Sequence, residues 1–161
     1  MKTVTERIPE KIQELLDYSA KEVDYSKGFG ESLKKMRQQD GMIKVLAVFA
    51  KISKTLLGRT MQFQYADSYA LYVITKVNKK TVELTWVDYC DGWVDDRIGK
   101  KGTVSLKYAE ETVYGRDRLD ACFAQAQAKK AQALLIPLKD QKKCIEYQPT
   151  SENTVRLPLS K

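Results

Sequence analysis

The segment from Tyr69 to Tyr89 constrains the fold most, because two stretches of alternating residues flank a short polar turn. Residues 69–77 alternate between two sets of side chains, and residues 81–89 place Val82, Leu84 and Trp86 on one face. Alternation with period two is typical of strands that bury one face. Asn78-Lys79-Lys80 supplies the polar turn between them. The pattern therefore predicts an antiparallel β-hairpin.

The chain before Gly58 has helical rather than strand-like spacing. Ile8, Ile12 and Leu15 recur at helical intervals, and Pro9 is expected in the first turn. After a break at residues 26–30, we expect a short helix over Glu31–Gln39. A second helix is expected over Gly41–Leu57, with Asp40 as its N-cap and Gly58 as its stop. Its predicted buried face comprises Met42, Val45, Leu46, Phe49, Ile52, Ser53 and Leu56.

The remaining segments predict further short elements. Met61–Tyr65 and Thr103–Leu106 read as strands, and Tyr108–Val113 reads as a helical turn. Arg116–Leu134 predicts a helix with Leu119, Cys122, Phe123 and Ala126 in one stripe. A second hairpin is expected from Lys143–Gln148 and Thr154–Leu159.

These elements predict an α+β fold, in which N-terminal and C-terminal helices flank a small, strongly bent antiparallel β-sheet or SH3-like barrel. With 161 residues and 43% apolar side chains, the chain has room for one compact unit. Within it we expect a helical region over 1–57 packed on the core, a small β-barrel over 58–115, and a helix plus hairpin over 116–161.

The string Trp86-Val87-Asp88-Tyr89 resembles the strand signature of Tudor-type barrels, in which a VDYG-like segment ends a strand before a sharp turn. Here Cys90 occupies the glycine position, and the turn glycine follows at Gly92. The resemblance implies an SH3-like fold more than a function. It also implies that an aromatic cage of the Tudor kind, which receives methylated lysine or arginine, is one use of such residues.

Composition excludes several classes of catalyst and site. The chain has no histidine, which excludes Ser-His-Asp and Cys-His catalysis and histidine-ligated zinc. Its three cysteines are odd in number and form no CxxC pair, so we expect packing residues in a reduced setting. Lysines interrupt the longest apolar segment, Met42–Leu57, and glutamates occupy the N-terminus, so we expect no membrane span, no secretion signal and a cytoplasmic location. No cofactor is expected.

The stretch Leu84–Gly102 gathers aromatic and acidic residues and is a candidate binding surface. Alternation assigns Trp86 to the core, whereas Trp93 lies in a loop with glycines and is expected to be exposed. The candidate binding residues of this surface are Tyr89, Asp91, Trp93, Asp95 and Asp96. Four acids form the only candidate metal or acid–base cluster, with carboxylates that suit magnesium: Asp88, Asp91, Asp95 and Asp96. The calcium-loop order is absent, and we assign no metal site.

The positive charge lies outside the predicted barrel. The formal net charge is +7, with +3 in residues 1–57, zero in 58–115 and +4 in 116–161. Lysines in such clusters contact phosphates and release counterions, although clusters also serve only as solvated surface. The candidate phosphate-binding residues are Lys100, Lys101, Lys129, Lys130, Lys142 and Lys143.

Three functions follow from these patterns. The leading one is a non-catalytic nucleic-acid-binding accessory protein, with DNA or RNA as partner and basic flanks on the phosphates. The alternative is a protein–protein interaction or inhibitory module, from a bacterium or a mobile element, that uses the acidic and aromatic loop. A third is a metal-dependent nuclease that uses Asp88 and Asp91.

Overall fold

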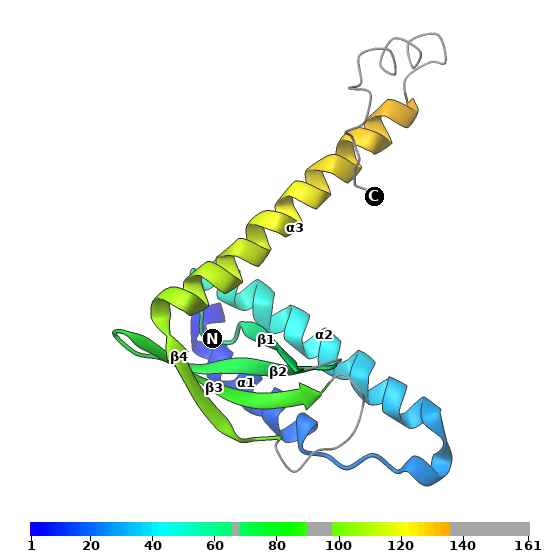
Figure 1. Cartoon of the computed structure of the whole chain (residues 1–161), viewed down its shortest axis with the longest axis vertical. Helices are drawn as coiled ribbons and strands as arrows, with labels where there is room; N and C mark the ends of the chain where they lie inside the picture. The colour runs from blue at the N-terminus through cyan, green and yellow to red at the C-terminus, as the bar shows by residue number, and fades with distance from the viewer. Residues whose placement is uncertain (66–67, 90–97, 136–161) are drawn as a thin grey trace. The chain divides into compact units, whose positions relative to one another are not determined.

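A computed structural model of the chain describes residues 1–65, 68–89 and 98–135 (Figure 1). The chain divides into two compact units, Met1–Arg116 and Asp117–Lys161. Its elements, in chain order, are α1 (Val4–Ser19), the 3-10 turn η1 (Tyr25–Lys27), α2 (Phe29–Ser53), β1 (Thr60–Tyr65), β2 (Ser68–Val77), β3 (Thr81–Tyr89), β4 (Lys101–Ser105) and α3 (Leu106–Leu135).

Helix α1 begins earlier than the apolar spacing indicates, because a capping box starts it at Val4. The Thr3 hydroxyl accepts from the Glu6 amide at 3.2 Å, and the Glu6 carboxylate accepts from the Thr3 amide at 3.2 Å. Pro9 therefore lies inside the helix and not in its first turn, so that expectation is wrong. The predicted apolar face is correct, since Ile8, Ile12 and Leu15 are buried.

Helix α2 is one continuous helix, so the two predicted helices over Glu31–Gln39 and Gly41–Leu57 are wrong. Asp40 is no N-cap; its carboxylate accepts from the Lys44 ammonium one turn later, at 2.8 Å. The buried face runs through Ser32, Gln39, Leu46 and Ala50, whereas Val45 and Ile52 are exposed.

A buried glutamine explains why α2 does not look continuous in the sequence. Gln39 occupies a core position and donates from Nε2 to the Ser19 hydroxyl at 2.9 Å and to the Val87 carbonyl at 3.2 Å. These bonds give the amide nitrogen two acceptors and tie α1, α2 and β3 together. A polar residue on the inward face thus interrupts the apolar period without interrupting the helix.

The four strands form one antiparallel sheet in the order β1-β2-β3-β4, curled into a half-barrel. The predicted hairpin is confirmed, with β3 spanning the predicted residues and β2 beginning one residue earlier. The pairing of β2 with β3 shifts register between Leu71 and Tyr72 and again between Ile74 and Lys76. Such irregularities increase local twist, which suits a strongly bent sheet.

Each face of the sheet has its own apolar cluster in the first unit. On one face, Val73 and Val87 pack with Ile8, Ile12 and Leu15 of α1 and with Leu46 of α2. On the other, strand residues pack with Ala109 and Val113 in the first turns of α3: Met61, Ile74, Val82 and Leu84. Each large apolar side chain buried here contributes roughly 1.5–3 kcal/mol. The α+β fold with helices flanking a bent antiparallel sheet is confirmed.

Helix α3 also merges two predicted elements, since it runs unbroken through the expected turn at Tyr108–Val113 and the expected helix at Arg116–Leu134. Leu119, Cys122 and Phe123 of the predicted stripe are exposed. The predicted C-terminal hairpin lies outside the described residues. No helix in the described part of the chain is both long and apolar enough to cross a membrane.

Candidate functional site

A glycine turn after α2 brings the start of β1 against the middle of β2. Lys54 caps α2 with a left-handed backbone, and Gly58 has φ of 88°. A Cβ atom at Gly58 would lie 3.0 Å from the Leu46 side chain and 3.3 Å from that of Ile8. The Gly58 amide donates to the Ile74 carbonyl at 2.9 Å, and the Ile74 amide donates to the Arg59 carbonyl at 2.8 Å. Only glycine fits here without strain.

The turn of the β2–β3 hairpin lies against the start of α3. The Asn78 amide donates to the Thr81 carbonyl at 2.8 Å and closes the turn. The Leu106 amide then donates to the Lys80 carbonyl, also at 2.8 Å. This bond brings Lys107 close to Lys79 and Lys80, and all three side chains are exposed. We call these three residues the hairpin lysines.

The end of α2, the hairpin turn and the start of α3 lie at the same end of the first unit, which we call the hairpin end (Figure 1). These segments and the residues next to them carry eight basic residues: Lys51, Lys54, Arg59, Lys76, Lys79, Lys80, Lys107 and Arg116. The same segments carry fewer acidic side chains: Glu83, Glu110 and Glu111. The local field at this end is therefore positive.

An ion pair and the charges of a neighbouring helix turn reduce this positive field. Lys76 and Glu83 form an exposed ion pair across the hairpin at 3.8 Å, which contributes little to stability. The Thr5 and Ser53 hydroxyls lie 2.8 Å apart, which places the first turn of α1 at the hairpin end as well. That turn adds charges of both signs. The Lys2 ammonium donates to Glu10, and this contact lowers the pKa of the Glu10 carboxyl.

An aromatic row crosses the sheet on the face that α3 covers in part. The Tyr72 ring lies 5.2 Å from Trp86 and 5.3 Å from Phe63, measured between centroids, and Phe63 also contacts Tyr108 at 6.3 Å. Trp86 is 7% exposed, which confirms its predicted place in the core. Edge-on and tilted ring contacts of this kind stabilise a sheet face.

The predicted loop site falls mostly outside the described residues, which end at Tyr89 and resume at Ile98. Asp91, Trp93, Asp95 and Asp96 lie in that gap. Lys142 and Lys143 lie beyond Leu135 and are also outside the described residues. The backbone of Tyr89 ends β3 opposite Ala70. The predictions for these side chains stay predictions.

The described lysines of the predicted site do not form one group. Lys100 and Lys101 are exposed beside the far end of β4, where the Lys100 carbonyl accepts from the Trp86 amide at 2.9 Å. They are separated from Lys107 by the length of β4, about 13 Å at ~3.3 Å per residue. Lys129 and Lys130 are exposed on α3 within the second unit.

The hairpin lysines are the group that sequence reasoning missed. Lys79 and Lys80 read only as turn residues, because turns favour polar side chains of any kind. The adjacent lysines were a visible signal, but their approach to Lys107 depends on the fold.

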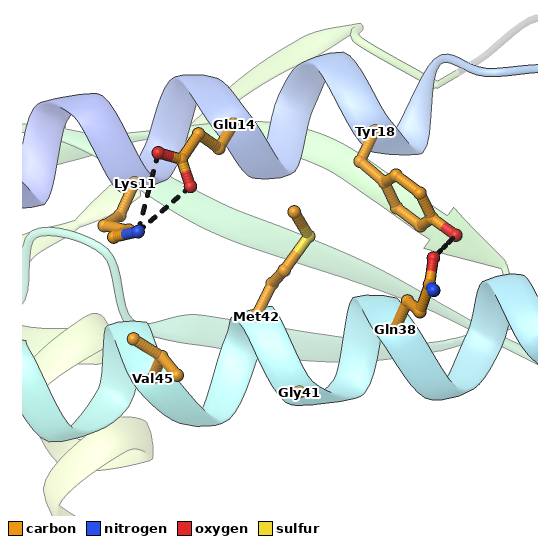
Figure 2. A pocket seen from close by; sticks show the side chains of 7 residues that line it. All are labelled: Lys11, Glu14, Tyr18, Gln38, Gly41, Met42 and Val45. Atoms are coloured by element: carbon orange, nitrogen blue, oxygen red, sulfur yellow. Dashed lines mark hydrogen bonds and ion pairs between the residues drawn. The ribbon is translucent and has the colours of Figure 1, made fainter.

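An apolar groove of about 450 Å³ lies between α1 and α2 (Figure 2). Met42 and Val45 of α2 face it, and Tyr18 of α1 closes one end with a hydrogen bond from its hydroxyl to Gln38. Lys11 and Glu14 pair on the α1 side at 3.1 Å. The lining suits an apolar side chain better than a charged ligand.

Within the described residues, no group of three or more cysteine, aspartate or glutamate side chains is placed to hold a metal ion. The backbone of Asp88 lies in β3 opposite Leu71, but its side chain and the whole of Asp91 are outside the described part of the chain, so the nuclease prediction stays a prediction. Comparison with protein families, curated proteins and solved structures finds no match to this chain.

Proposed function

We propose that this chain is a non-catalytic nucleic-acid-binding accessory protein that contacts backbone phosphates with its hairpin end. The proposal rests on the approach of the Lys107 backbone to the Lys79–Lys80 turn, which the bond from Leu106 to Lys80 holds in place, and on the exposure of all three lysine side chains. Their exposed ammonium groups suit phosphate oxygens, which are accessible on either strand of a duplex.

The chemistry of the contact determines its specificity. Lysine is a point charge on a flexible stem, and phosphate contacts position a protein without selecting a base sequence. We therefore expect binding to DNA and RNA with little sequence preference. Three phosphate contacts should make the affinity for duplex DNA fall roughly fortyfold between about 50 and about 200 mM salt.

A salt titration tests this proposal. The full chain is titrated into fluorescently labelled duplex DNA, and separately into duplex RNA, at increasing sodium chloride concentration. The expected result is binding at low salt whose logarithmic slope corresponds to about three released counterions. No binding to either duplex at the lowest salt would contradict the proposal.

A further inference from the structure

A small pocket lies where the start of β1 meets the third turn of α3, within the first unit. Its volume is about 120 Å³. Because liquid water occupies about 30 Å³ per molecule, this is space for roughly four waters. A tetrahedral oxyanion fits such a space, whereas a nucleoside does not.

The side chains that line the pocket are rich in hydrogen-bond donors. Arg59 and Arg116 contribute guanidinium groups, Thr60 and Thr112 contribute hydroxyls, and Gln62 contributes an amide. Among the described residues that line the pocket, none is acidic. Guanidinium groups match the geometry of phosphate oxygens and bind them through paired hydrogen bonds.

The two arginines differ in how they are held. Arg59 is 8% exposed, and its backbone is fixed by bonds to Leu56 at 2.9 Å and to Ile74 at 2.8 Å. Arg116 is exposed on α3. The pocket thus has one buried cation on a backbone held by two hydrogen bonds, and a second cation accessible from solvent. That arrangement is pre-organised for a small anion, since little side-chain order is lost at Arg59 on binding.

We propose that this pocket binds a single phosphate group. The group belongs either to a nucleic-acid backbone or to a free phosphate monoester, because both present the same oxygens. The proposal extends the proposed function without resting on it, since the hairpin lysines line no part of the pocket.

The first experiment uses inorganic phosphate as the probe. The full chain is titrated with phosphate at constant ionic strength, and backbone amide shifts are followed by NMR. We expect saturable shifts centred on Thr60, Gln62 and Thr112. Arg116→Gln should weaken phosphate binding at least about tenfold, because it removes a charge-assisted contact.

Arg118→Gln is the matched control, since it removes the same charge from an exposed position two residues along α3. It should leave phosphate affinity within about twofold of the starting chain. Shifts that fail to saturate, or equal losses in the two variants, would overturn the proposal. A thermal melt of Arg116→Gln confirms that the variant is folded.

The second experiment identifies the source of the phosphate and keeps the two proposals apart. The same variants are titrated into the labelled duplexes at low salt. A larger loss for Arg116→Gln than for Arg118→Gln supports a backbone phosphate in the pocket. Equal duplex binding with selective loss of inorganic phosphate supports a free monoester. If no duplex binds at all, the function proposed above is wrong, while the phosphate titration still shows whether the pocket binds phosphate.

Discussion

The two ends of the first unit each carry a pair of adjacent lysines but use these charges differently. At the start of α2, the Lys35 ammonium donates to the Ser19 carbonyl at 2.9 Å and to the Lys21 carbonyl, at the end of α1. A cation there satisfies carbonyls that the helix leaves unpaired and interacts favourably with its dipole. At the hairpin end, the backbone of Lys80 makes the structural bond and its side chain stays exposed.

The comparison shows that lysine density alone does not identify a binding surface. Lys34, Lys35 and Arg37 form the denser cluster in the sequence, yet one member closes a helix end. Lys79 and Lys80 form a pair that reads as a turn, yet the fold adds Lys107 to them. A phosphate-binding role therefore fits the second group better than the first.

Gly58→Ala should have the largest effect on the hairpin end. The substitution adds a left-handed backbone penalty and a contact with Leu46 at 3.0 Å, which together cost about 2–4 kcal/mol. Gly99→Ala is the control, since Gly99 has φ of 91° but nothing within 4 Å of its added Cβ. It should cost only the backbone penalty, about 1–2 kcal/mol. Urea unfolding measures both, and equal losses would show that the close contact at Gly58 is unimportant.

Lys35→Gln should have a smaller effect, which tests the structural role assigned to the other end. Losing the hydrogen bonds to two carbonyls in a partly exposed place should lower the free energy of unfolding by about 1 kcal/mol. Lys34→Gln removes the same charge from an exposed neighbour and should change stability by less than about 0.5 kcal/mol. Equal urea midpoints for the two variants would contradict the structural role assigned to Lys35.

Glu6→Gln should have the smallest effect and should depend on pH. Hydrogen bonds from the Thr3 side chain and then its backbone lower the pKa of the Glu6 carboxyl from its ordinary 4.5. A lowered pKa stabilises the fold above the unfolded value, and this stabilisation is lost as pH falls through the folded value. The gap in urea midpoint between the variant and the starting chain should therefore shrink from about pH 7 to about pH 3. A gap that is constant across this range would show that the charge of Glu6 has no role in the cap.

The elements that the sequence predicted correctly are those whose signal is local. The hairpin follows from the alternation around Val82, Leu84 and Trp86, which is a property of adjacent residues. The division of α2 was wrong because Asp40 and Gly41 look like a helix start, while Gln39 is satisfied only by α1 and β3. Contacts with α1 and β3, and not the local sequence, therefore explain why Gln39 lies on the buried face of one continuous helix.

The candidate site is harder to predict from the sequence, because it depends on contacts between residues that are far apart in the chain. Lys107 reaches the hairpin turn because β4 pairs with β3 as far as the turn, where Leu106 then bonds to Lys80, 26 positions away in the sequence. Arg59 and Arg116 line the same pocket only because the first turns of α3 pack on the sheet beside β1. No periodicity or motif encodes either approach.

The most direct test compares duplex binding by two triple variants of equal charge. Lys79→Gln/Lys80→Gln/Lys107→Gln removes the hairpin lysines, and Lys27→Gln/Lys34→Gln/Arg37→Gln removes three exposed charges at the other end. We predict that the first variant reduces the salt slope by about three and abolishes most low-salt binding, while the second retains most of both. Equal losses of slope and affinity in the two variants would contradict the assignment of phosphate binding to the hairpin end.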